Sequence, residues 1–196
     1  MALKIAITGG IGSGKSAALA CVREMGYTAF SCDEIYKEII LTPAYVQKVQ
    51  AIFPSCVADG KINRKALSDI VFSDEKSREK LNGIAHPMIM ERLEFLMNIG
   101  ENSLVFAEVP LLFEGGYEGL FDKIIVIVRD YEARIQDVMR RDGTDKISVI
   151  KRMQAQFPYE QKDCKMKKKN VVVVGNDKTL IDLKMELEKI ITSWQL

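Results

Sequence analysis

The residues best suited to chemistry lie in one short stretch, positions 9–16, which has the pattern G-x-x-x-x-G-K-S. Its glycines allow successive backbone N–H groups to turn inward around an anion. The Lys15 side chain can reach terminal phosphates, and the Ser16 hydroxyl is placed to ligate Mg²⁺. The pattern predicts a phosphate-binding loop for ATP or GTP. The expected nucleotide contacts are Gly10, Ile11, Gly12, Ser13, Gly14, Lys15, Ser16 and Ala17.

The segments on either side of this loop have the required character. An apolar run at 3–8 precedes it, and residues 15–25 carry apolar side chains at 18, 19, 22 and 25 before Gly26. This spacing predicts a strand, the loop and an amphipathic helix that ends at a glycine. The helix N-terminus adds its dipole to the anion site. This context disfavours a glycine-rich turn that binds nothing.

Two acidic residues stand near predicted strand ends. Asp33 follows the strand candidate at 27–31, and Glu108 lies near the end of the apolar run at 103–109. The carboxyl ends of parallel strands line the ligand crevice, so we expect Asp33 to face the same space as the phosphate loop. An Asp at a helix start is also a common N-cap, and both roles can coexist. We expect Glu108 to contact Mg²⁺ through water, or else to pair with a nearby Lys or Arg.

From 42 to 100 the alternation of strands and helices stops. The pattern predicts helices over 44–53, 66–72, 74–85 and 87–99, with Asp59-Gly60 as a turn. This all-helical block is too long for a simple crossover, so we interpret it as an insertion that closes over a second substrate. The lone His86, at a predicted helix junction, is a structural residue by default. We expect the loop at 110–114 to expose apolar side chains, which would cover a neighbouring group that the sequence does not identify.

The next predicted strand and helix, 123–128 and 131–141, bring three arginines: Arg134, Arg140 and Arg141. Arginines beside a transferring phosphoryl group stabilise its charge, although such clusters are more often solvated faces. The charged segment at about 140–169 fits either a lid that closes over polyphosphate or a solvated helix. A last strand at 170–174 and an amphipathic helix at 179–194 complete the chain.

The composition suits one main domain, with 196 residues of which 47% are hydrophobic. A net charge of +1 gives no reason to expect nucleic-acid or membrane-surface binding. We expect a cytoplasmic protein, because no apolar stretch approaches a membrane span and residues 1–8 leave no space for a signal peptide. The four cysteines have no C-x-x-C spacing, so they suggest neither zinc nor a disulfide framework. Five apolar strands joined largely by helices predict a three-layer α/β fold with a parallel sheet.

Several of these segments together resemble the dephospho-coenzyme A kinases, a family of P-loop kinases, over nearly the whole chain. Matching motifs lie at 7–16, at Asp33, at 59–67, at Leu81-Asn82, at His86-Pro87 and at 109–114. The chain departs from the family pattern at three places. It has Ser31-Cys32-Asp33 where members commonly show Asp-Ala-Asp, and Ala17 in place of Thr. Its last strand lies between Lys168-Lys169-Asn170 and Gly175-Asn176 instead of Ala-Asp and Asn-Gly.

The resemblance implies a P-loop fold with a five-stranded parallel sheet, a helical acceptor-binding insertion at 42–100 and a lid. It implies transfer of a phosphoryl group from ATP to the ribose 3′-hydroxyl of dephospho-coenzyme A. Asp33 would orient or deprotonate that hydroxyl, Lys15 would hold the β- and γ-phosphates, and Arg140 or a neighbour would neutralise developing charge. Further acceptor contacts implied by the resemblance are His86, Pro110, Leu111 and Leu112.

We expect a monomer or small homo-oligomer. Two alternative functions stay open. The protein could be a P-loop kinase for another small acceptor, or a regulatory protein that binds nucleotide without transferring phosphate.

Overall fold

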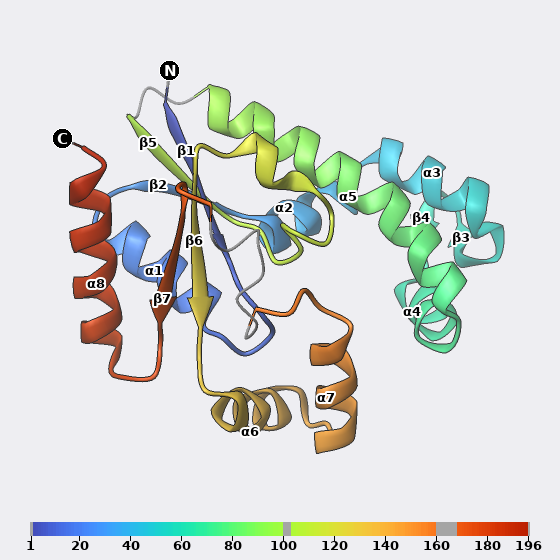
Figure 1. Ribbon diagram of the computed structural model, residues 1–196. Coiled ribbons are helices and arrows are strands. Elements are labelled where there is room, and N and C mark those ends of the chain that lie inside the picture. The colour runs from blue at the N-terminus through green and yellow to red at the C-terminus, as the bar shows by residue number, and fades with distance from the viewer. Residues whose placement is uncertain (1, 100–102, 160–167, 196) are drawn as a thin grey trace. The chain divides into compact units, whose positions relative to one another are not determined.

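A computed structural model describes residues 2–99, 103–159 and 168–195 (Figure 1). The chain divides into two compact units. The first consists of Met1–Ser31 together with Met97–Leu196, and the second is Cys32–Leu96. Each unit has its own secondary structure and is described in turn.

The first unit is built on a sheet of five parallel strands in the order β2-β5-β1-β6-β7. The strands are β1 (Leu3–Thr8), β2 (Thr28–Ser31), β5 (Leu104–Glu108), β6 (Lys123–Val128) and β7 (Val171–Gly175). All five predicted strands are confirmed. Consecutive residues of β1, β5 and β6 are buried, which explains their continuous apolar runs in place of the alternation of a half-exposed strand.

Helices flank the sheet, and this confirms the predicted α/β class. Helix α1 (Lys15–Glu24) contacts α8 (Leu180–Ser193), and both share a core with sheet residues such as Ile5 and Ile125 (Figure 1). Helix α8 begins with a capping box between Thr179 and Asp182. A short 3₁₀ helix, η2 (Tyr117–Leu120), lies between β5 and β6.

A smaller core joins the two helices that follow β6. Helices α6 (Tyr131–Asp142) and α7 (Lys146–Gln154) pack on each other through Ile135, Val138 and Val149. Gly143 ends α6 in the left-handed conformation that a residue with a side chain adopts only with strain. This turn sets the start of the charged segment that was interpreted as a lid, of which 160–167 lie outside the described residues.

The second unit contains four helices and a small hairpin. Its elements are α2 (Cys32–Ile39), α3 (Pro43–Ile52), the 3₁₀ helix η1 (Pro54–Cys56), β3 (Val57–Ala58), β4 (Lys61–Ile62), α4 (Arg64–Ser73) and most of α5 (Glu75–Asn98). The predicted insertion at 42–100 was all-helical, and β3 and β4 correct this. The Asp59-Gly60 turn is confirmed. Both of its residues have positive φ, as a tight two-residue hairpin turn requires.

Helix α5 corrects a second prediction, because it runs through Pro87 without ending there. A proline inside a helix costs about 3 kcal/mol. On both sides of Pro87, however, the helix buries an apolar stripe that includes Ile84, Ile89 and Leu93. Each such side chain contributes about 1.5–3 kcal/mol when buried, so the stripe outweighs the proline. His86 therefore lies within a helix and not at a helix junction.

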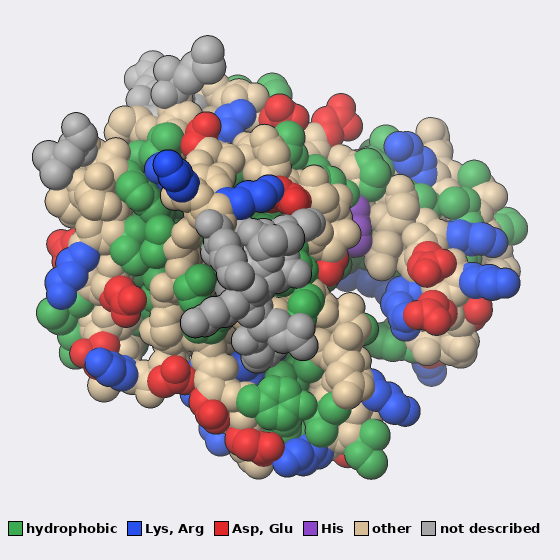
Figure 2. Space-filling model, viewed as in Figure 1, with side chains coloured by type: hydrophobic (Ala, Val, Ile, Leu, Met, Phe, Trp, Pro, Cys, Tyr) green, Lys and Arg blue, Asp and Glu red, His purple; other side chains and the backbone are tan. Residues whose placement is uncertain are grey.

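The surface carries charges of both signs. On the face drawn in Figure 2, acidic and basic side chains are interspersed, in agreement with the net charge of +1. Among the described residues, no helix is both long enough and apolar enough to cross a membrane.

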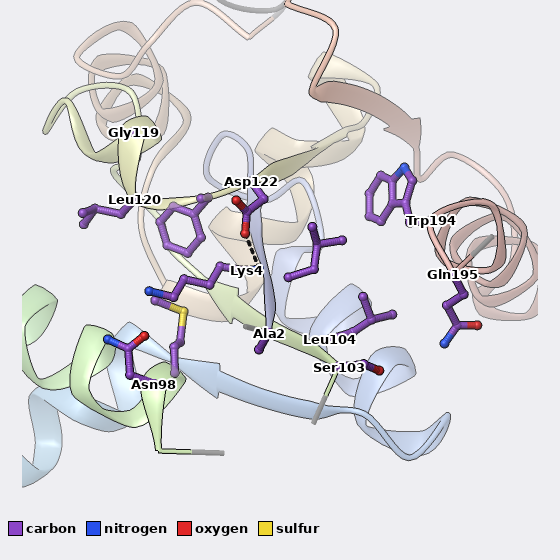
Figure 3. A pocket seen from close by; sticks show the side chains of 13 residues that line it. Ala2, Lys4, Asn98, Ser103, Leu104, Gly119, Leu120, Asp122, Trp194 and Gln195 are labelled. Atoms are coloured by element: carbon purple, nitrogen blue, oxygen red, sulfur yellow. Dashed lines mark hydrogen bonds between the residues drawn. The ribbon is translucent and has the colours of Figure 1, made fainter. Parts of the chain in front are cut away.

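A hollow of about 760 Å³ opens at the amino-terminal ends of β1 and β5, beside Leu3 and Leu104 (Figure 3). The Lys4 backbone N–H donates to the Asp122 carboxylate there, at 2.8 Å. The phosphate loop follows the other, carboxyl-terminal end of β1. This hollow is therefore not the predicted nucleotide site.

Candidate functional site

The phosphate loop has the predicted strand–loop–helix setting, between β1 and α1. Gly14 precedes α1 in a left-handed conformation, at φ 95°. The Lys15 ammonium folds back over the loop and donates to the carbonyls of Gly9 and Gly10 at 2.9 and 3.0 Å. A cation thus lies on the loop at the N-terminus of a helix, an arrangement that favours an anionic ligand.

The candidate metal ligands Ser16 and Glu108 come together. The Ser16 hydroxyl donates to one oxygen of the Glu108 carboxylate at 2.9 Å, and Ser31 donates to the other at 3.4 Å. Glu108, at the end of β5, is only 4% exposed. Within the described residues no three His, Cys, Asp or Glu side chains form a metal cluster. Hydroxyl and carboxylate oxygens nevertheless suit Mg²⁺, which keeps several waters and is often shared with substrate phosphates.

Of the three candidate arginines, Arg134 contacts the phosphate loop, and which of them meets the transferring phosphate stays a prediction. Arg134 is 3% exposed, and its Nε donates to the Ile11 carbonyl at 2.9 Å. A Cβ on Gly10 would lie 2.3 Å from its guanidinium, so a glycine at position 10 leaves room for it. Burial lowers the pKa of Arg134. The Arg140 side chain is 80% exposed and pairs with Asp137 on its own helix at 3.6 Å.

Exchange of Arg134 for Ala is expected to lower the melting temperature of the ligand-free protein by several degrees. A buried hydrogen bond from a charged donor contributes about 1.5–3 kcal/mol, and its loss leaves the Ile11 carbonyl without this donor. Arg140→Ala is the matched control, because an exposed ion pair contributes little. Thermal unfolding followed by circular dichroism compares the two variants. Equal shifts would contradict the structural role of Arg134.

The residues that follow α7 attach to the phosphate loop. The Ile11 N–H donates to the Gln156 carboxamide oxygen at 2.7 Å, and the hydroxyls of Tyr159 and Thr8 lie 3.2 Å apart. Tyr159 is buried, which raises the pKa of its phenol. Sequence reasoning missed Gln156 and Tyr159, because an isolated polar or aromatic residue in a charged segment has no periodicity that marks it.

The loop after β5 is more buried than predicted. Leu112 and Phe113 are 0% and 4% exposed, so the expectation that they expose apolar surface is wrong. Phe113 is covered by the segment after α7, with its ring centre 4.7 Å from that of Phe157. Pro110 and Leu111 are partly exposed. The acceptor contacts expected of Pro110, Leu111 and Leu112 stay predictions.

The loop after β7 also contacts the phosphate loop. The Asn176 amide donates to the Ser13 carbonyl at 2.9 Å, and a Cβ on Gly14 would lie 2.1 Å from that amide nitrogen. The exit of the last strand, where this chain departs from the family pattern, therefore helps to fix the shape of the phosphate loop.

The second unit has its own pocket of about 510 Å³, and Asp33 is on its rim. Helix α2 begins at Cys32, so Asp33 lies in its first turn and not at the N-cap position. Its side chain is exposed. The pocket is lined by Asp33, Tyr36, Lys37, Ile40, Tyr45, Ile62, Arg64, Leu67, Ser68, Val71 and Leu81. His86 is not among these residues.

The His86 imidazole is expected to titrate below its ordinary pKa of 6.5. Partial burial in α5 disfavours the charged form and lowers the pKa. The unfolded chain then binds more protons than the folded one just below pH 6.5, so His86 reduces stability as the pH falls through that value. His86 is the only histidine of the chain, so its NMR signal is unambiguous. A midpoint at or above 6.5 would contradict this prediction.

The chain is similar to dephospho-CoA kinases over nearly its whole length. The dephospho-CoA kinase family model matches residues 3–182. The enzyme of Fusobacterium nucleatum is 33% identical, over 94% of this chain and 95% of the relative. That of Thermus thermophilus is 34% identical, over 95% and 89%.

Solved structures agree with this. A Thermus thermophilus protein superposes with a TM-score of 0.80 at 33% identity, over 98% of this chain and 97% of the other. The dephospho-CoA kinase of Campylobacter jejuni superposes with a TM-score of 0.70 at 29% identity, over 98% of this chain and 96% of the other. A shikimate kinase from Acinetobacter baumannii, with a TM-score of 0.59 and 12% identity, shares the fold alone. With a family match that extends from β1 into α8 and relatives aligned over almost their full length, this chain belongs to the dephospho-CoA kinase family.

Proposed function

We propose that this protein phosphorylates the ribose 3′-hydroxyl of dephospho-CoA with ATP and Mg²⁺, giving coenzyme A and ADP in the last step of coenzyme A biosynthesis. Membership of the dephospho-CoA kinase family supports dephospho-CoA as the acceptor. The observation that carries the nucleotide half is the Ser16–Glu108 hydrogen bond beside Lys15 in a complete phosphate loop. The protein acts in the cytoplasm, as a monomer or small homo-oligomer.

The nucleotide half of the reaction uses the first unit. Lys15 and the loop amides hold the β- and γ-phosphates, and Ser16, with Glu108 acting through water, would hold Mg²⁺. When bound, Mg²⁺ would neutralise part of the negative charge of the β- and γ-phosphates. Arg134 holds the loop through its hydrogen bond to the Ile11 carbonyl, and Arg140 or a neighbour neutralises the charge that develops on the transferring group.

The acceptor half depends first on Asp33, in the second unit. Asp33 accepts a hydrogen bond from the 3′-hydroxyl and takes its proton as the new P–O bond forms. Because the transition state of phosphoryl transfer is loose, the orientation that Asp33 imposes matters more than its basicity. His86, Pro110, Leu111 and Leu112 are further acceptor contacts in this proposal.

The decisive experiment is ADP release from ATP and Mg²⁺ with dephospho-CoA as acceptor, with AMP in parallel and no acceptor as the blank. We expect turnover with dephospho-CoA alone. Turnover with AMP alone would move the protein to another class of small-acceptor kinase. ATP binding without any transfer would favour a regulatory protein.

A further inference from the structure

The pocket of the second unit has two unlike parts. Its rim carries three exposed charged residues: Asp33 in the first turn of α2, Lys37 in the last turn of α2 and Arg64 in the first turn of α4. The remainder is largely apolar and comes from α2, α3, β4, α4 and α5. Its apolar wall consists of Ile40, Ile62, Leu67, Val71 and Leu81. A ligand that fits both parts has an anionic group joined to a less polar chain.

The two rim cations have no acidic partner in the described part of the chain, since neither Lys37 nor Arg64 forms an ion pair there. Arg78, on α5 in the same unit, pairs with Glu75. Arg64 also opens α4, at the positive end of the helix dipole, where a cation reduces helix stability. Helix stability therefore does not explain Arg64, whereas an anionic ligand would.

The spacing of the rim residues fits a nucleotide. Asp33 and Lys37 are four residues apart on α2, so they share a face and are separated by about 6 Å along the axis. This is comparable to the span of one ribose, from its 3′-hydroxyl to a phosphate at its 5′ side. Helix α2 is held in place beside the pocket by an aromatic contact, because the ring of the buried Tyr45 packs edge-on against the ring of Tyr36.

We propose that Lys37 and Arg64 bind the 5′-diphosphate of the acceptor, and that the apolar wall receives the start of its pantetheine chain. This inference rests on the proposed function and deepens it. With the 3′-hydroxyl at Asp33, the diphosphate meets the two cations and the chain beyond it runs along Ile40 and Ile62. AMP has one phosphate and no such chain, so the same contacts select against it.

The test compares Arg64→Ala and Lys37→Ala with a matched control, Lys65→Ala. Lys65 is the neighbour of Arg64 in the first turn of α4, is exposed and does not line the pocket. A hydrogen bond between charged groups is worth about 1.5–3 kcal/mol, so we expect either variant to raise the KM for dephospho-CoA about tenfold or more. The kcat and the KM for ATP stay within about twofold, and Lys65→Ala changes neither KM.

The salt dependence of KM separates ligand binding from a structural role. In the wild type, added NaCl screens the two cations and raises the KM for dephospho-CoA. We expect this rise to be shallower in Arg64→Ala and partly restored in Arg64→Lys. If the wild type does not phosphorylate dephospho-CoA, the proposed function itself fails. If it does, and Arg64→Ala has the KM and salt dependence of Lys65→Ala, the diphosphate assignment is wrong.

Discussion

Exchange of Asp33 for Asn is expected to lower kcat with dephospho-CoA by at least about 100-fold, the contribution of a positioned general base. The amide keeps the size of the carboxylate, but it neither orients the 3′-hydroxyl as a charged acceptor does nor takes its proton. Asp33 is exposed on α2, in the second unit, while the phosphate loop belongs to the first. The substitution leaves every residue of the phosphate loop unchanged, so the Kd for ATP should stay within about twofold of the wild-type value.

Steady-state assays and titration with a fluorescent ATP analogue measure the two quantities separately. Asp69→Asn is the matched control, because this aspartate is exposed in the same unit and does not line the pocket. It should have wild-type turnover and affinity. Normal turnover of the Asp33→Asn variant would remove the proposed role, whatever its affinity for ATP.

The second large effect is expected from Gly9→Ala, which should abolish measurable ATP binding and lower the melting temperature. A Cβ at this position would lie 2.2 Å from the backbone carbonyl of Ile127, and φ of Gly9 is +146°, a conformation that residues with side chains rarely adopt. Ile127 is in β6, which is paired on both sides in the sheet. Its carbonyl cannot move without disturbing the ladder, so the phosphate loop must distort instead.

Gly83→Ala is the control for this substitution. Gly83 lies inside α5, with no heavy atom within 4 Å of the position that a Cβ would take. Alanine is the better helix former by about 1 kcal/mol, so the melting temperature should rise slightly and ATP binding should not change. ATP binding by Gly9→Ala with wild-type affinity would show that the loop tolerates a side chain there.

The parts of the fold that could be predicted are those that neighbouring residues determine. Continuous apolar runs mark β1, β5 and β6, which are buried on both faces, and the less buried β2 and β7 were predicted as well. The glycine pattern of the phosphate loop predicted the turn between β1 and α1, which places Lys15 and Ser16 in the first turn of that helix. The Ser16–Glu108 contact followed from topology, since parallel strands bring their carboxyl ends to one edge of the sheet.

The parts that could not be predicted depend on packing between distant segments. Proline usually ends a helix, yet the buried stripe of α5 carries it past Pro87. Helical spacing alone cannot say which arginine of α6 reaches the loop, because that is decided by the position of the whole helix. Likewise, Phe113 seemed exposed beside Pro110, but the rings of Phe157 and Tyr159, more than forty residues later in the chain, pack against it.

The place of β1 in the middle of the sheet determines when this strand can fold during synthesis on the ribosome. Leu3 pairs with Leu104 and Ile5 with Lys123, so both neighbours of the first strand are translated in the second half of the chain. Until β5 and β6 have been synthesised, β1 has no ladder to join and the glycines after it have no scaffold. Such distant pairings slow folding and leave apolar strands exposed meanwhile. The nucleotide site is thus encoded first and assembled late, and a nascent chain that stops before β6 has no means of holding ATP.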